Sequence, residues 1–160
     1  MERTKKYDLV IGGIRFAADL PIADDSTHGV EARYLIALER ETVRVLCEEG
    51  QPTGDGFRFL RSRSGLARSD LAQSEGSFRP LARLFGVTLE EYSAWENGSL
   101  AIPLPAWELM VTIAHEYVFS QSTLTVDRMR KRIDGADRPM TQYRVPVVEL
   151  EEAARAAKGS

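Results

Sequence analysis

Residues 81–98 read LARLFGVTLEEYSAWENG, and this stretch predicts two short helices joined by a tight turn. Leu81, Ala82 and Phe85 give the first helix an apolar edge, and the small Ala82 side chain lets another helix approach closely. Gly86 then permits the sharp turn, because glycine adopts backbone angles that other residues avoid. The stretch therefore indicates a helix-turn-helix.

The second helix of this pair has a predicted start, a buried face and an end. Thr88 and Glu91 have the spacing of a capping box, which starts a helix. Tyr92 and Trp95 fall on the face turned to the core, and the Asn-Gly pair at 97–98 ends the helix. Three other side chains are left outward: Leu89, Glu90 and Ser93. A capped second helix that exposes polar residues is the geometry that enters the major groove of DNA.

The order Leu-Ala, three residues, Gly-Val-Thr and then Trp-Glu-Asn-Gly resembles the Cro/repressor-type (XRE) helix-turn-helix. Over residues 7–118 the chain is more narrowly similar to the MqsA-type antitoxins. The similar features are a hairpin, a helix, the segment TGDGFRFLR at 53–61, the helix-turn-helix, and a Pro-rich entry to a further helix at Pro103 and Pro105. The resemblance implies a helix-turn-helix that dimerises on operator DNA, and an N-terminal part that binds zinc and engages a toxin.

The chain departs from that family at the zinc ligands. Where a Cys-x-x-Cys-Gly would stand, it has Asp25-Ser-Thr-His28-Gly29. A closed structural zinc site needs four ligands, mostly thiolates, and of this pair only His28 remains. We therefore expect neither a metal nor another cofactor.

A second departure is an insertion near residues 73–82. The pattern at 65–72 would normally run straight into the segment that ends at Gly86. Either residues 68–73 or residues 78–85 could therefore form the first, positioning helix. Only the second segment places Leu-Ala at the right distance from Gly86, so we favour it, with Pro80 tolerated in a first turn.

The candidate DNA-binding residues follow from the outward positions and the nearby arginines. They are Arg68, Arg79, Arg83, Thr88, Leu89, Glu90, Ser93 and Asn97. The positions that usually read bases hold Leu89, Glu90 and Glu91, and Ala94 stands where an arginine is common. Glutamate can accept a hydrogen bond from cytosine but repels phosphates, so this recognition surface is poorer than usual.

The rest of the chain predicts an α+β, mainly α fold. Alternating apolar residues predict strands over 7–11 and 14–20, and the Gly12-Gly13 pair between them is typical of a tight hairpin. A helix follows over about 30–49, and Gln51 to Gly56 has the composition of a linker. We divide the chain into a hairpin-and-helix element (1–50), a helix-turn-helix domain (51–120) and a partly ordered extension (121–160). In that extension residues 145–148 could be a short strand and residues 149–158 a helical tail.

Composition restricts the class of protein. The net charge of −3 is unusual for a nucleic-acid binder, but all six basic residues within 57–100 are arginines. Of these, Arg58, Arg61 and Arg63 form either a solvated face or phosphate contacts, and the same two interpretations apply to the basic run 128–132. The sequence has one cysteine, and it has neither an apolar run that could span a membrane nor a signal-peptide pattern. We therefore expect a cytoplasmic, nucleoid-associated protein. His28 and His115 lie far apart without a nucleophile motif, so we expect no enzyme.

These observations favour a sequence-specific DNA-binding transcriptional regulator that acts as a homodimer on an operator. The resemblance implies an autoregulating antitoxin whose protein partner is a toxin. The alternative is a protein-interaction module with a degenerate helix-turn-helix that no longer reads DNA. The acidic recognition helix favours the alternative. The Gly86 turn, the capping box and the clustered arginines favour DNA.

Overall fold

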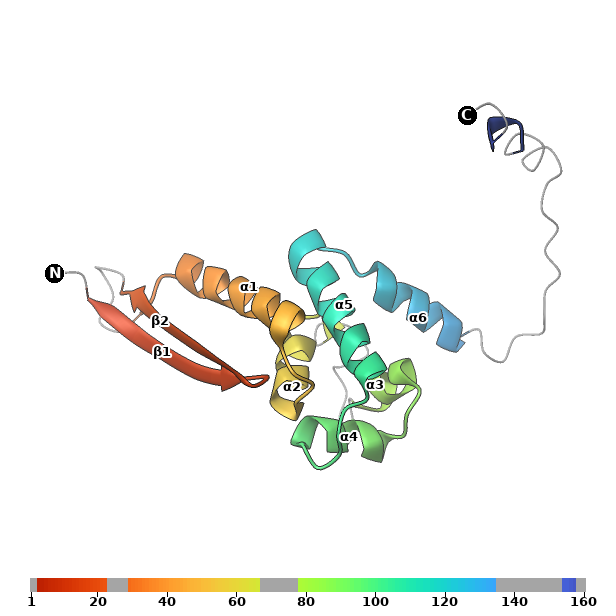
Figure 1. The fold of residues 1–160 in the computed structure, drawn as a ribbon, viewed down its shortest axis with the longest axis horizontal. Helices are drawn as coiled ribbons and strands as arrows, with labels where there is room; N and C mark the ends of the chain where they lie inside the picture. Colours follow the sequence, from red (N-terminus) through yellow and green to blue (C-terminus); the bar gives the residue numbers. More distant parts are fainter. Residues whose placement is uncertain (1–2, 23–28, 67–77, 135–153, 158–160) are drawn as a thin grey trace.

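The computed structural model describes residues 3–22, 29–66, 78–134 and 154–157. An N-terminal hairpin of two strands is followed by helices, which confirms the predicted α+β, mainly α class (Figure 1). The elements are β1 (Thr4–Ile11), β2 (Ile14–Pro21), α1 (Ala32–Glu49), α2 (Gly54–Ser62), α3 (Phe78–Phe85), α4 (Leu89–Asn97), α5 (Leu104–Ser120) and α6 (Leu124–Asp134). The predicted strand over 145–148 lies outside the described residues, whereas residues 154–157 of the predicted helical tail are helical. Within the described residues, no helix is both long and apolar enough to cross a membrane.

The hairpin forms where the sequence predicts it and extends further at its open end. Its strands are antiparallel, with Ile11 opposite Ile14 at the turn. Gly12 and Gly13 have φ angles of 60° and 75°, the left-handed backbone that a two-residue hairpin turn requires. Ile11 is buried beside the turn, whereas Leu9 is 51 % exposed. The hairpin is therefore anchored more firmly at its turn than along the outer part of β1.

The hairpin turn is seated on the end of α1 and the start of α2. Gly12 accepts a hydrogen bond from the backbone N–H of Gln51 at 3.0 Å, and its own N–H donates to Asp55 at 3.4 Å. A Cβ on Gly12 would stand 2.6 Å from Cδ2 of the fully buried Leu46. Gly12 is thus needed both for the turn and for the close approach to α1.

The predicted linker over 51–56 is wrong in its second half, because α2 begins at Gly54. Thr53 caps this helix by accepting a hydrogen bond from the Gly56 N–H at 3.3 Å. A Cβ on Gly54 would lie 2.7 Å from the carbonyl oxygen of Trp95, and one on Gly56 would lie 3.1 Å from the Trp107 ring. These two glycines allow α2 to pack closely against α4 and α5, and they do not form a flexible linker.

One hydrophobic core connects helices α1 to α6 and the hairpin turn. Helix α1 packs along α5, and α2 lies between α4 and α5. Each of the three predicted segments contributes buried residues to this core. Segment 1–50 contributes Ile11, Val43 and Leu46, segment 51–120 contributes Phe57, Trp107 and Met110 among others, and segment 121–160 contributes Val126. The hairpin and α6 are therefore held against the same body as the predicted helix-turn-helix.

We predict that Gly12→Ala lowers the free energy of unfolding by about 2 kcal/mol or more, because a positive φ costs about 1–2 kcal/mol and the new methyl group also meets Leu46. Gly86→Ala is the matched control. Gly86 has a φ of 69°, but a Cβ added there would meet no atom within 4 Å, so only the backbone cost of about 1–2 kcal/mol applies. Urea denaturation measures both variants. Equal losses would show that the core around Leu46 adjusts freely.

Candidate nucleic-acid interface

Helix α3, the turn at Gly86 and helix α4 form the predicted helix-turn-helix. Of the two alternatives for the positioning helix, residues 78–85 are confirmed as a helix, while residues 68–73 lie outside the described residues. Gly86 has a φ of 69°, and the N–H of Val87 donates to the carbonyl of Ala82 at 2.9 Å. The turn is thus closed by backbone hydrogen bonds at a residue that favours left-handed angles.

Helix α4 begins and ends where the sequence predicts. Thr88 has an extended backbone, and its hydroxyl accepts a hydrogen bond from the Glu91 N–H at 3.2 Å, which satisfies a donor at the helix start. Gly98 ends the helix in the left-handed conformation with a φ of 79°. The side chain of Asn97 accepts from the Ser99 N–H at 2.9 Å. Thr88 and Asn97, two of the predicted DNA-binding residues, therefore hold the ends of this helix.

A cluster of aromatic rings fixes α4 to α2 and α3. Tyr92 and Trp95 are buried, as predicted, and the Phe57 ring of α2 packs against them at centroid distances of 5.8 and 6.0 Å. Phe85 at the end of α3 lies 5.9 Å from Tyr92. Such contacts add stability beyond the burial of area, so the orientation of α4 is set by packing rather than by the turn alone.

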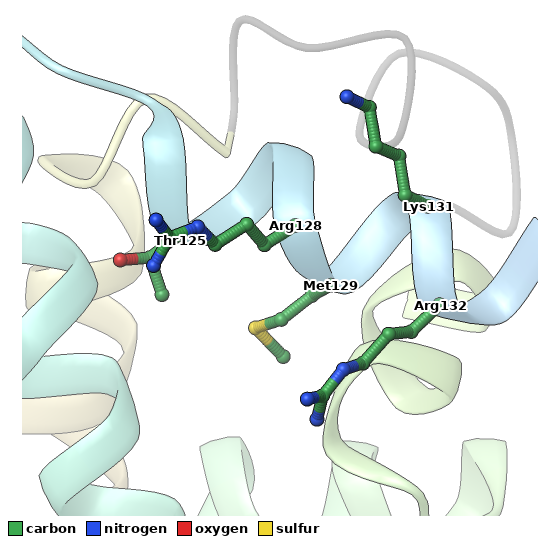
Figure 2. Close-up of a pocket in the computed structure, with 5 residues that line it drawn as sticks. All are labelled: Thr125, Arg128, Met129, Lys131 and Arg132. Carbon is green, nitrogen blue, oxygen red and sulfur yellow. The ribbon is translucent and has the colours of Figure 1, made fainter. Parts of the chain in front are cut away.

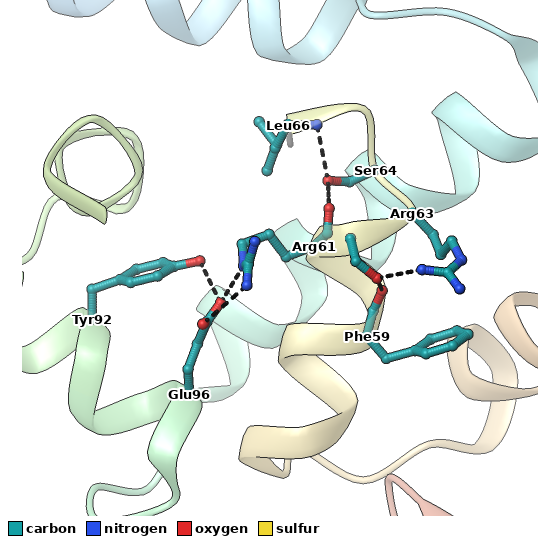
Figure 3. A network of polar contacts seen from close by, with 8 residues as sticks. Phe59, Arg61, Arg63, Ser64, Leu66, Tyr92 and Glu96 are labelled. Carbon is teal, nitrogen blue, oxygen red and sulfur yellow. Dashed lines mark hydrogen bonds and ion pairs between the residues drawn. The ribbon is translucent and has the colours of Figure 1, made fainter. Parts of the chain in front are cut away.

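A buried ion pair joins α2 to α4 beside Tyr92 (Figure 3). The Arg61 guanidinium donates to both carboxylate oxygens of Glu96, at 2.5 and 3.3 Å, and the Tyr92 hydroxyl donates to the same carboxylate at 3.1 Å. The Glu96 side chain is 6 % exposed. Arg61 also lies over the Phe78 ring, 5.4 Å from its centroid, and so contacts the first residue of α3. One guanidinium therefore connects three helices.

The environment of Tyr92 keeps its phenol protonated. Burial, and then the charge of Glu96, raise the pKa of Tyr92 well above its ordinary value. The hydroxyl therefore remains a donor to the carboxylate throughout the physiological pH range. This hydrogen bond satisfies part of the acceptor capacity of a carboxylate that has left water.

Two of the three arginines of α2 and its C-terminal end are engaged within the protein. Arg61 pairs with Glu96 (Figure 3), and Arg63 pairs with Glu39 of α1 at 2.7 Å. Neither is a free cation on a solvated face. Arg58 is exposed, and no ion pair to it is found within the described residues.

The exposed cations of the helix-turn-helix lie on α3. Arg79 and Arg83 are both exposed and four residues apart, so they share one face of this helix. Neither forms an ion pair with any residue that the structure describes. Arg68, the third predicted arginine, lies outside the described ranges.

The remaining predicted residues lie on α4 with different degrees of exposure. Glu90 is exposed in the first turn, next to the equally exposed Glu91. Leu89 and Ser93, which the sequence predicts to point outward, are half-buried. The solvent-facing part of α4 is therefore narrow and acidic at its N-terminal end, with the two arginines on the adjoining helix.

Other chemistry has little support in the described residues. Among residues 3–22, 29–66, 78–134 and 154–157, no group of three or more His, Cys, Asp or Glu side chains could hold a metal ion. Asp25 and His28 lie outside these ranges. Burial raises the pKa of Cys47 to about 11, so its thiol remains protonated at neutral pH, and it lies 3.8 Å from the carbonyl of Val111.

Comparison with known proteins gives no match: no family model matches the chain, and no curated protein or solved structure does. The functional interpretation therefore depends on the residues and their geometry.

We predict that Glu96→Ala lowers the free energy of unfolding by about 3 kcal/mol, because it leaves the Arg61 guanidinium and the Tyr92 hydroxyl without their partner. Replacing both charges, with Arg61→Met and Glu96→Leu, restores most of that loss, since apolar residues of similar volume remove the unpaired cation. Urea denaturation measures both variants, with Glu90→Ala on the exposed face of α4 as the control. A loss for Glu96→Ala no larger than that of the control would contradict the role given to the pair.

Proposed function

We propose that this protein binds double-stranded DNA through α3 and α4 and acts as a transcriptional regulator. The observation that carries the proposal is the α3–Gly86–α4 unit, in which α4 is capped, packed on one face and exposed at its N-terminal turn. A recognition helix uses its N-terminal residues to contact base edges, while the helix before it crosses the backbone.

Each exposed side chain then has a specific role. Arg79 and Arg83 on α3 bind phosphates, because exposed guanidinium groups that form no ion pair with a described residue are suited to anionic oxygens. Glu90 accepts a hydrogen bond from the amino group of a cytosine in the major groove. The helix dipole favours Glu90 at this end of α4, which offsets part of its repulsion from phosphates.

A regulator of this type binds as a two-fold homodimer on half-sites about one helical turn apart. An autoregulating antitoxin would in addition need a surface for a toxin. Leu9 and Val10 on β1 are 51 % and 62 % exposed, and this supports the hairpin as that surface.

A second candidate function is a protein-interaction module that no longer reads DNA. The observation that favours it is the pair of exposed carboxylates, Glu90 and Glu91, at the position where a DNA-binding helix approaches phosphates. An acidic turn of this kind suits a basic protein partner better than a polyanion.

The first test concerns the arginines of α3. We predict that Arg79→Ala with Arg83→Ala weakens binding to the protein's own promoter duplex and to a scrambled duplex alike. The slope of log affinity against log salt should become shallower by about 2, because two fewer counterions are released. The control is Lys5→Ala with Lys6→Ala, which removes the same charge from the exposed part of the hairpin. If both double variants change the slope equally, net charge rather than α3 explains the effect.

The second test concerns Glu90 and separates the two functions. We predict that Glu90→Ala relaxes sequence preference at one base pair by about 1–3 kcal/mol, and that Glu90→Lys raises affinity for all duplexes. Titrations of specific and scrambled duplexes at physiological salt measure both. If the wild-type protein has no preference and neither variant alters binding, the interaction module replaces the regulator.

A further inference from the structure

Helix α6 carries a cationic face beside the helix-turn-helix. One side of α6 packs into the core through the buried Val126, with Met129 and Ile133 at the edge of that contact. Among the described side chains of α6, Leu124 and Asp127 are exposed in the first turn. Beyond that turn the exposed side chains are all cations: Arg128, Lys131 and Arg132. Since the buried side orients the helix, these cations keep a defined direction.

The cations surround a surface hollow (Figure 2). The hollow has a volume of about 530 Å³ and is lined by Thr125, Arg128, Met129, Lys131 and Arg132. Figure 2 shows the Arg128 and Arg132 side chains extending from the same side of α6, with Met129 between them, while Lys131 extends away. The hollow thus combines two guanidinium groups with a flexible ammonium group at its edge.

The charges of this face are not compensated within the described part of the chain. Arg128 and Arg132 are four residues apart on one helix, where like charges destabilise each other. None of the ion pairs between described residues includes a cation of α6. The acidic residue Asp127 instead accepts a hydrogen bond from Thr123 at 2.9 Å. An anionic partner would relieve the repulsion between the two arginines.

The position of α6 favours a DNA phosphate as the anionic partner. Helix α6 packs against α3, which bears the exposed Arg79 and Arg83, and the two helices lie side by side at one end of the molecule (Figure 1). Arg128 and Arg132 are about 6 Å apart along the helix axis. A DNA strand has one phosphate about every 3.4 Å of duplex axis, so two guanidinium groups at this spacing can reach separate phosphates of one strand.

We propose that Arg128, Lys131 and Arg132 form a second phosphate-binding surface, which contacts the DNA backbone beside the segment bound by α3 and α4. This inference rests on the proposed function and extends its contact surface by one helix. The surface contributes affinity and register but no base reading, because phosphates have the same chemistry at every sequence.

The test is a salt titration of the full chain with Arg128→Ala and Arg132→Ala together, against the promoter duplex and a scrambled duplex of equal length. The expected result is a loss of affinity of about tenfold for both duplexes near 0.1 M salt, and a log–log salt slope shallower by about 2. Arg128→Lys with Arg132→Lys should retain the wild-type slope, because the slope depends on the number of phosphate charges neutralised and not on the shape of the cation. The Lys5→Ala, Lys6→Ala variant again serves as the charge-matched control, and circular dichroism verifies that each variant is folded.

The other outcomes are distinguishable. If the wild-type protein binds and Arg79→Ala with Arg83→Ala weakens it, while the α6 variant behaves like the hairpin control, the α6 surface is overturned and the proposed function stands. If the α6 variant loses affinity for the promoter duplex alone, the residues read sequence and the backbone assignment is wrong. If the wild-type protein binds neither duplex at any salt concentration, the proposed function and this inference both fail.

Discussion

The ion pair between Arg61 and Glu96 constrains how α2, α3 and α4 can be arranged once the aromatic cluster has packed them together. It lies beside Tyr92 of the aromatic cluster, where the Glu96 carboxylate is almost fully removed from water and accepts hydrogen bonds from both Arg61 and Tyr92. A buried pair of this kind adds little net stability, because desolvation cancels most of the attraction, but losing one partner is costly. Its effect is therefore to disfavour arrangements of α4 that separate the two charges, while Arg61 also contacts Phe78 at the start of α3.

Elements with a strong local signal could be predicted from the sequence. The Gly12-Gly13 turn, the Thr88 cap and the Gly98 stop each depend on the conformation of a few adjacent residues, and all three occur as predicted. For these positions the local chemistry of the chain is sufficient. In the candidate site the prediction holds in part: Glu90 is exposed, whereas Leu89 and Ser93 are half-buried.

Features that depend on distant contacts could not be predicted. The glycines at 54 and 56 have the composition of a linker, yet the carbonyl of Trp95 and the ring of Trp107 explain why each lacks a side chain. The sequence around Arg61 indicates a surface cation or a phosphate contact, because the partner of its guanidinium lies 35 residues away. The glutamate that follows Trp95 is part of the repressor-type pattern, but the sequence does not indicate that Arg61 is its partner.

Helix α2 connects two regions that the sequence places far apart. Its first turn contacts the hairpin turn through Gly12 and Asp55, and its last turn holds α4 through Arg61. Nine helical residues span roughly 14 Å, so α2 transmits a displacement at one end to the other as a rigid rod. If α4 binds a target, a ligand that shifted the hairpin turn and with it α4 would change the affinity for that target, and thermodynamic linkage requires that the target change the affinity of the hairpin for that ligand by the same factor.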